Sequence, residues 1–248
     1  ETLEEPESAV TSYNRVLAVQ DDKLEALTKL AALLLELKKW TELATILDRK
    51  SELLSDPDET VATLRQLARL RQELLEENEK AIETWQRLLS FAMADVEALK
   101  ALEVLFEKSE QYDELSEILK SIIELGNEDR IPTAFKLATI QAEQLEDTYE
   151  AINALKVIID EAPENVKALE KLASLYRKEE NWHDLNLTID RMVALEPDDA
   201  RRNDLICETW QVLQVEIGDV EAALEKYRFI LDFDNTHADA RGALEELL

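Results

Sequence analysis

The sequence predicts an all-α chain built as a stack of antiparallel helical hairpins. Leu, Ala, Glu and Lys dominate the 248 residues, whereas glycine (3) and proline (5) are scarce, which is the composition of nearly continuous helix. Apolar residues recur at helical spacing between short turns. Three sequence elements also return with one common period, which is typical of repeat proteins.

The stretch 164–197 shows the repeating unit most clearly. In its first half, apolar residues such as Leu172 and Tyr176 form one stripe on a helix that otherwise carries Lys and Glu. A second stripe begins at Trp182 after only a few residues, so the two helices must lie antiparallel and share their apolar faces. Pro197 ends the unit, because the residue before a proline is disfavoured in a helix. A hairpin of about 34 residues cannot cover both faces of its helices alone and therefore needs neighbours.

An internal repeat supplies these neighbours. Each of three elements returns in steps of 70 or 72 residues, so the period is about 71 residues and holds two hairpins of different type. The elements begin at Trp40, Tyr112 and Trp182; at Ala9, Ala81, Ala151 and Ala223; and at Leu24, Val96, Val166 and Ala238.

We therefore expect residues 1–248 to form a single repeat array of about 14 helices. The array begins and ends in mid-repeat without a strongly polar capping helix, so we expect it to be part of a longer array. The expected segments are an orphan helix 5–19, hairpins at about 22–55, 58–93, 95–127, 129–162, 164–196 and 199–234, and an orphan helix 237–248.

These hairpins resemble the tetratricopeptide repeat (TPR), whose pattern is W-x2-L-G-x2-Y…A-x3-F…P. The matching positions are Leu169, Leu172, Ala173, Tyr176, Leu185, Ile189 and Pro197. Leu185 departs from the pattern, which has a small residue there, whereas the interleaved hairpins keep that small residue as Ala81, Ala151 and Ala223. The resemblance covers essentially the whole chain, which is similar to bacterial TPR-like arrays that alternate the two hairpin forms. It implies a right-handed α-solenoid that binds proteins or peptides or builds assemblies.

The chemistry-bearing residues do not form a recognisable catalytic, metal or cofactor motif. His183 and His237 lie 54 residues apart, and we interpret both as exposed turn residues. Cys207 is the single cysteine, which we interpret as a structural thiol. Three glycines do not supply a phosphate-binding loop, and carboxylate pairs carry no specificity among 56 acidic residues. We predict no enzyme activity, no cofactor and no metal.

The net charge of −28 limits the classes of partner that the chain can bind. Such a surface repels nucleic-acid phosphate and anionic membranes, so we expect neither as a partner. No apolar run approaches ~18 residues, so we also expect no membrane insertion. The acidity fits either the solubility of a long helical surface or a basic partner. We expect a protein or peptide partner, with the cytoplasm as the default location.

The TPR resemblance also implies where a partner would bind, because the first helix of each hairpin in that family lines a concave groove. The 36 positions that would line this groove carry a net charge of +1, and the other 212 carry −29. We interpret this as a groove for an acidic or mixed-polarity peptide, with arginines as carboxylate forks. The alternative is that helix contact surfaces simply carry fewer acids. The predicted groove residues are Arg65, Arg69, Gln72, Lys100, Phe135 and Arg177.

Three functions are compatible with these expectations. The first is a non-catalytic scaffold that binds a protein or peptide partner in its concave groove. The second is an architectural solenoid that self-associates through its exposed terminal helices. The third is a regulatory segment of a larger enzyme.

Overall fold

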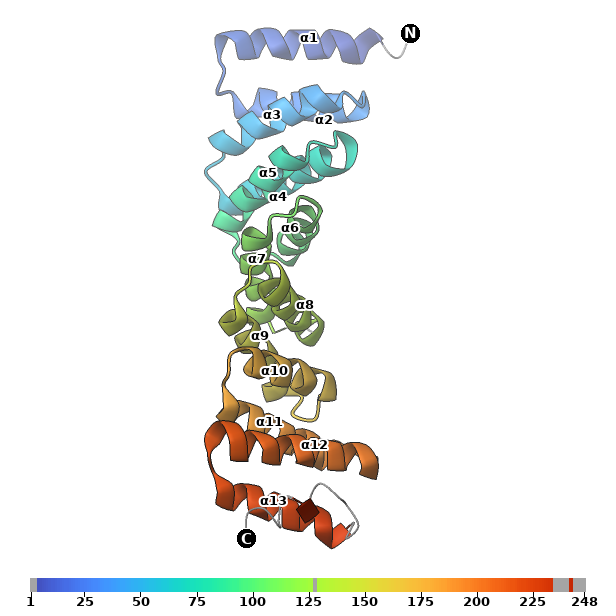
Figure 1. The fold of residues 1–248 in the computed structure, drawn as a ribbon. Coiled ribbons are helices and arrows are strands. Elements are labelled where there is room, and N and C mark those ends of the chain that lie inside the picture. Colours follow the sequence, from blue (N-terminus) through green and yellow to red (C-terminus); the bar gives the residue numbers. More distant parts are fainter. Residues whose placement is uncertain (1–3, 127–128, 234–240, 243–248) are drawn as a thin grey trace. The chain divides into compact units, whose positions relative to one another are not determined.

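The computed structural model describes residues 4–126, 129–233 and 241–242 (Figure 1). Within these residues the chain forms 13 α-helices and two π-helical segments, with no strand, so the all-α prediction is confirmed. The predicted last helix, 237–248, falls outside the described residues apart from 241–242. The chain divides into two compact units, Glu1–Leu125 (unit 1) and Gly126–Leu248 (unit 2), and each is described by itself.

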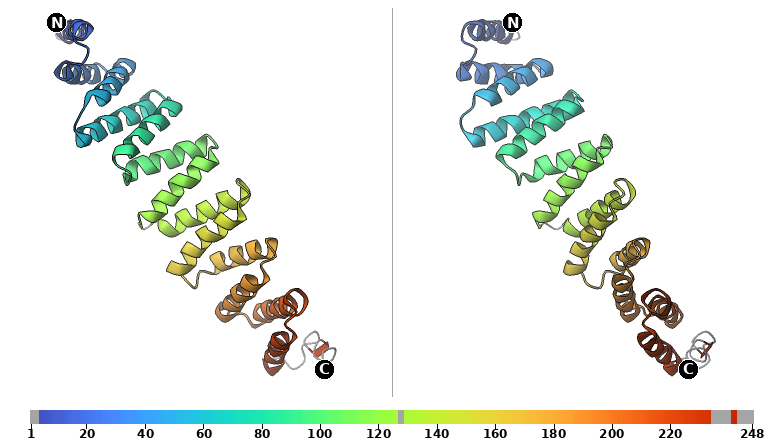
Figure 2. Two further views of the ribbon diagram at one scale, coloured as in Figure 1. Left: turned by 90° about the vertical axis from the view of Figure 1, so that its left-hand side faces the viewer. Right: turned by 60° about the vertical axis from the view of Figure 1, so that its left-hand side comes forward.

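Unit 1 is a single helix followed by three antiparallel hairpins, α2/α3, α4/α5 and α6/α7. Each hairpin packs against the next through its flanking helices, which Figure 2 shows from two sides. The elements are α1 (Glu4–Val19), α2 (Leu24–Glu36), α3 (Trp40–Leu53), α4 (Pro57–Arg69), the π-helical η1 (Leu70–Leu74), α5 (Asn78–Phe91), α6 (Val96–Lys108) and α7 (Tyr112–Glu124).

Unit 2 consists of the hairpins α8/α9, α10/α11 and α12/α13. They stack in chain order, α9 against α10 and α11 against α12. The elements are α8 (Arg130–Glu143), α9 (Thr148–Glu161), α10 (Val166–Lys178), α11 (Trp182–Leu195), α12 (Asp199–Gln211), the π-helical η2 (Val212–Ile217) and α13 (Val220–Phe233).

The apolar stripes that predict the helices form the core of each unit. In unit 1, Leu27 and Leu34 of α2 pack with Leu43 and Leu47 of α3, and all four side chains are buried. The small residue of one hairpin type and its larger counterpart in the other type are both buried. These positions are Ala81, Ala151 and Ala223, and Leu43, Leu115 and Leu185.

Side-chain caps fix where several first helices begin. Asp56 accepts hydrogen bonds from the N–H groups of Asp58 and Glu59, at 2.9 and 3.0 Å, with Pro57 as the first residue of α4. A capping carboxylate satisfies N–H groups that have no partner inside the helix, and proline is tolerated there because it lacks an N–H. Asp95 and Asn165 cap α6 and α10 in the same way.

The turn of each hairpin contains one residue in the left-handed region of backbone conformation. Glycine occupies this position once, as Gly218 with φ of 78°. The other five turns use a longer residue with φ of 54–55°, a conformation that costs a side-chain-bearing residue roughly 1–2 kcal/mol. These five residues are Lys38, Glu76, Glu110, Glu146 and Glu180.

Two first helices end in a wider turn. After α4, the N–H of Leu75 donates to the carbonyl of Leu70 at 3.1 Å, which is the five-residue spacing of a π-helix. This spacing places Leu70 and Leu75 on one face, and both pack into the unit 1 core. The segment η2 extends α12 in the same manner.

Candidate functional site

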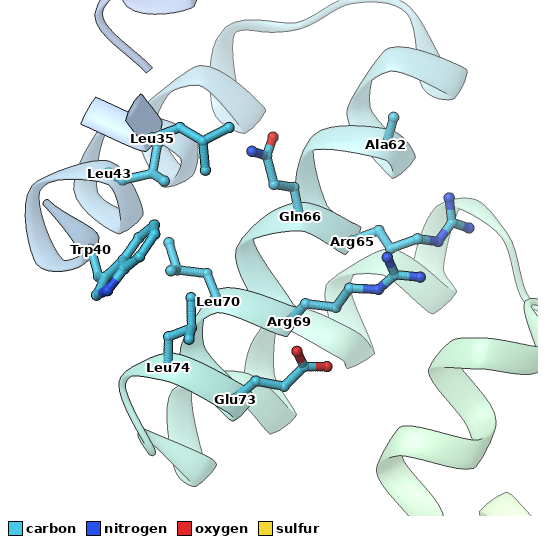
Figure 3. A pocket seen from close by; sticks show the side chains of 10 residues that line it. All are labelled: Leu35, Trp40, Leu43, Ala62, Arg65, Gln66, Arg69, Leu70, Glu73 and Leu74. Atoms are coloured by element: carbon cyan, nitrogen blue, oxygen red, sulfur yellow. The ribbon is translucent and has the colours of Figure 1, made fainter. Parts of the chain in front are cut away.

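A pocket lined by four leucines and a tryptophan lies in unit 1, between hairpin α2/α3 and the first helix of the next hairpin. We call it the Trp40 pocket, and its volume is ≈ 300 Å³. Leucines and the Trp40 indole form one side, and polar side chains of α4 and η1 form the other (Figure 3). Its lining residues are Leu35, Trp40, Leu43, Ala62, Arg65, Gln66, Arg69, Leu70, Glu73 and Leu74.

The turn between α2 and α3 positions the aromatic wall. The N–H of Lys39 donates to the carbonyl of Leu34 at 3.0 Å, and Lys38 adopts the left-handed conformation. This tight turn makes Trp40 the first residue of α3, so its half-buried indole stands at the end of the hairpin. Leu35 lies in the last turn of α2 and remains 47% exposed.

The wider turn η1 supplies the opposite apolar wall. Leu70 is buried and forms the floor together with Leu43. Leu74, the last residue of η1, is 53% exposed at the rim. Two exposed leucines therefore face a common hollow whose floor is already buried.

Arg65 and Arg69 form the polar side of the pocket and are paired with the next first helix. Both extend from α4 away from Trp40 (Figure 3). Arg65 binds Asp95, the cap of α6, and its Nε lies 3.3 Å from a carboxylate oxygen of Glu97. Arg69 also binds Glu97, and this hydrogen bond raises the pKa of the guanidinium above its usual value. The two predicted carboxylate forks therefore already hold carboxylates of the chain itself.

Gln72 and Lys100 lie outside this pocket's lining. The Oε1 of Gln72 accepts a hydrogen bond from the indole Nε1 of Trp85 at 2.9 Å, so its side chain serves a buried tryptophan of α5. Lys100 lies exposed on α6.

A second pocket of the same construction lies in unit 2. Its volume is ≈ 320 Å³, and Trp182 and Leu185 occupy the places of Trp40 and Leu43, 142 residues earlier in the sequence. The full lining is Arg177, Trp182, Leu185, Glu208, Gln211, Val212, Val215 and Glu216. Both pockets adjoin a π-helical segment, η1 or η2. Because π-turns inside helices are frequent at functional sites, their recurrence here singles out these pockets.

The rims of the two pockets differ in chemistry. Arg177 stands where unit 1 has Leu35, and Glu216 stands where it has Leu74. Arg177 pairs with Glu208, as the arginines of α4 pair with α6. At these two positions the pocket is thus apolar in unit 1 and charged in unit 2.

The comparisons with known proteins identify the fold. No family model matches the chain, and no curated protein matches its sequence. A chain in the structure of Naa15/Naa10 bound to HypK-THB is 13% identical with a TM-score of 0.53; the match covers 96% of this chain and 36% of that one. YrrB, a TPR protein with an unusual peptide-binding site, is 16% identical with a TM-score of 0.40, covering 76% and 93%. The C-terminal part of a TPR repeat-containing protein from Cytophaga hutchinsonii is 12% identical with a TM-score of 0.41, covering 97% and 95%.

At these identities the similarity concerns the fold alone. The type of fold follows from the antiparallel hairpins, which stack on one another at the spacing that the sequence repeat predicts. The chain has a TPR-like fold. It spans about 36% of the length of the Naa15/Naa10 chain that it matches.

The TPR-like arrangement distributes the six predicted groove residues among several places. It brings Arg65 and Arg69 together in the Trp40 pocket, whereas Arg177 lines the second pocket, beside Trp182. Phe135 lies on α8, in a third pocket with Lys167 and Lys171. As a set of ligand contacts, the six residues stay a prediction.

Trp40 and Leu74 are among the pocket residues that lie outside the six predicted groove residues. Trp40 is half-buried at a hairpin end. The signal that could have found it is its recurrence as Trp182, three residues before a leucine at the start of a second helix.

Two further properties of the TPR-like units concern metals and membranes. Among the described residues, no three His, Cys, Asp or Glu side chains are grouped so that they could hold a metal ion. In the part of the chain that the structure describes, no helix has both the length and the apolar character of a membrane span.

Proposed function

We propose that this chain is a non-catalytic protein-interaction scaffold whose Trp40 pocket receives an apolar side chain of a protein or peptide partner. The observation that carries the proposal is the exposed pair Leu35 and Leu74 above a buried floor. Residues of this chain are 34% charged, so two exposed leucines around one hollow stand out from the surface. Fully burying a Leu or Phe side chain contributes about 1.5–3 kcal/mol, which corresponds to roughly 10- to 150-fold in affinity.

The size of the pocket favours a side-chain anchor. Its ≈ 300 Å³ lies at the low end of the range of about 300–1,000 Å³ for small-molecule sites. The rim also offers Gln66 and Glu73, which can accept or donate hydrogen bonds to the backbone beside an inserted side chain. A pocket that holds one anchor and orients the flanking chain is typical of peptide recognition.

The chemistry of the lining supports the non-catalytic part of the proposal. The lining contains no histidine, cysteine, serine or threonine, so it lacks a nucleophile paired with a base. Both of its arginines bind carboxylates of α6. Such a lining is suited to binding.

A similarly folded chain supports an interaction role by analogy. The structure of Naa15/Naa10 bound to HypK-THB places this fold in an assembly of several proteins. The analogy extends to the class of function only.

The test uses a phage-displayed library of random 12-residue peptides selected on the purified chain. The selected peptide is then titrated by fluorescence anisotropy. Leu35→Arg with Leu74→Glu gives unit 1 the residues that unit 2 carries at equivalent positions, so the fold should tolerate the change. We expect this variant to bind at least 10-fold more weakly.

The control places an equally polar change on another exposed apolar residue, Val104→Arg, because Val104 is 58% exposed on α6. It should leave the affinity within about twofold. Failure to select any peptide, or equal binding by the Leu35/Leu74 variant, overturns the proposal. Circular dichroism confirms that each variant is folded.

A further inference from the structure

A second candidate binding surface, which carries two lysines, lies in unit 2. It is a hollow of ≈ 530 Å³ between α8 and α10, lined by Phe135, Lys167, Glu170, Lys171 and Ser174. We call these five residues the Phe135 surface. Phe135 is half-buried, whereas the four residues from α10 are exposed, so an aromatic floor lies beside accessible polar groups.

The Phe135 surface is basic although the chain is strongly acidic. Its one acid, Glu170, accepts a 2.8 Å hydrogen bond from Arg201 of α12 and is thereby compensated. Neither Lys167 nor Lys171 has an ion-pair partner within the residues that the structure describes. The chain has 56 acidic and 28 basic residues, so two neighbouring lysines without acids are contrary to its general pattern.

The rest of α10 adds no acid beside these lysines. Glu170 is the single acid of Val166–Lys178, and it is already bound to Arg201. At physiological ionic strength the screening length is about 8 Å, so a bound group experiences mainly these nearby charges and little of the net −28.

We propose that the Phe135 surface binds an acidic segment of a protein partner, with one apolar side chain packed on Phe135 and carboxylates on Lys167 and Lys171. The lysines are four residues apart on one helix, so their Cβ atoms are about 5–6 Å apart. Carboxylates match this spacing at i and i+2 of an extended segment, about 6.6–6.8 Å, or at i and i+4 of a helix. The partner segment therefore combines two acids at such a spacing with a nearby Leu or Phe.

This inference rests on the proposed role as an interaction scaffold, but it concerns a different site. The Phe135 surface belongs to unit 2, and the Trp40 pocket belongs to unit 1. Leu35→Arg with Leu74→Glu should leave binding at the Phe135 surface unchanged. The two proposals therefore succeed or fail separately.

The test uses three fluorescein-labelled 11-residue peptides and fluorescence anisotropy in 50 mM and 300 mM salt. The first has a central Leu flanked by Asp and Glu, the second replaces this Leu with Ala, and the third replaces the acids with Asn and Gln. We expect the first peptide to bind most tightly, at least fivefold above either comparison peptide. Its affinity should fall in high salt, because the contacts with the lysines are exposed and screened.

Variants locate the site. Lys167→Glu with Lys171→Glu should weaken binding at least 10-fold, and Phe135→Ala should weaken it at least fivefold. Lys29→Glu with Lys108→Glu makes the same change in charge on exposed residues of unit 1 and should have less than a twofold effect. Glu is favourable in the first turn of a helix, so the change at Lys167 should not disturb α10.

Each of the following results would overturn the inference. They are no binding of the first peptide at 300 µM, equal binding by the Lys167/Lys171 variant, no preference over the two comparison peptides, or equal competition by a 12-nucleotide single-stranded DNA. The last result would indicate a general polyanion site. A dimer in light scattering that Lys167→Glu with Lys171→Glu abolishes would assign the surface to a second copy of the chain instead.

Discussion

Asp48 on α3 accepts a 2.6 Å hydrogen bond from Arg71 of η1, so a carboxylate of one hairpin is joined to the wide turn of the next. The same carboxylate accepts a second hydrogen bond from Arg87 of α5 at 2.7 Å. Arg71 also donates to the hydroxyl of Thr84 at 2.6 Å and is itself buried. One partly buried polar cluster thus links three elements of unit 1.

In unit 2, the corresponding aspartate is bound by a cation from a different helix. Asp190 stands 142 residues after Asp48 and binds Lys226 of α13 at 2.6 Å. Lys226 stands in the place of Thr84, and Leu213 stands in the place of Arg71. The positive charge has therefore moved from the π-helical turn to the second helix of the hairpin.

The comparison of the two units predicts that one substitution can restore the stability that another removes. Arg71→Leu should lower the free energy of unfolding by about 1–2 kcal/mol, because Asp48 loses a charged hydrogen bond in a partly buried place. Adding Thr84→Lys restores the arrangement of unit 2 and should recover most of the loss. Urea unfolding of the single and double variants measures both. A double variant that is less stable than Arg71→Leu would contradict the prediction.

Asp48 also predicts a pH dependence. Burial opposes its ionisation, but hydrogen bonds from Arg87 and Arg71 outweigh burial and hold the pKa of this carboxyl below its usual value of 3.8. Its contribution to stability is therefore fully present above about pH 4 and is lost as the pH falls through the lowered pKa. Between pH 5 and pH 3, Asp48→Asn should lose less stability than the unchanged chain. Parallel slopes in urea titrations at several pH values would exclude this contribution.

The left-handed turn residues predict a gain in stability. Glu110→Gly should stabilise the α6/α7 hairpin by about 0.5–1 kcal/mol, because glycine adopts φ of 55° without the steric cost that Glu bears. Glu83→Gly, in the exposed middle of α5, is the matched control and should destabilise by about 1 kcal/mol. Thermal unfolding of both variants compares them. Destabilisation by both would show that the turn is not strained.

We predict that the side chain of Gln72 stabilises the folded chain. Gln72→Leu removes the acceptor of the buried Trp85 indole and should cost about 1–3 kcal/mol, the typical cost of a buried donor without a partner. Gln72→Glu keeps an acceptor oxygen and should cost less. Chemical denaturation gives the two values. Equal stability of both variants and the unchanged chain would leave ligand contact as the remaining role for this side chain.

Arg69 and Glu97 predict an effect of charge on stability. Arg69→Glu should lower the melting temperature, since two acids would then face each other between α4 and α6. Adding Glu97→Gln should raise it again, because the repulsion is removed and Arg65, which also contacts Glu97, faces no new positive charge. Differential scanning calorimetry of the three proteins decides the matter. No recovery in the double variant would mean that the pair contributes nothing to the contact.

The helices could be predicted because their signals are local. Leu172 and Tyr176 lie on one stripe of α10, and the period of about 71 residues assigns corresponding stripes to the other hairpins. The buried small residues follow from the same pattern, since Ala81 and Ala151 recur where two helices approach closely.

The pairing of the arginines could not be predicted in this way. The sequence indicates that Arg65 and Arg69 share a face of α4, but their engagement depends on how far α6 is offset along α4, which sets whether Asp95 and Glu97 come within reach. The π-helical turn after α4 is likewise decided by tertiary packing, because it forms where Leu70 and Leu75 both enter the core. Neither the arginine pairing nor the π-helical turn can be recognised from the spacing of apolar residues.

The wide turn η1 has a consequence for how such hairpins vary in length. A π-turn takes in one residue more than an α-turn, so an inserted residue can be absorbed inside the helix without lengthening the loop. From the start of α4 to the start of α5 there are 21 residues, as from α12 to α13, against 16 from α10 to α11. An insertion of this kind enlarges the wall beside the tryptophan while the hairpin keeps its tight connection. The five additional residues thus lengthen the first helix, because the connections 75–77 and 179–181 have the same length.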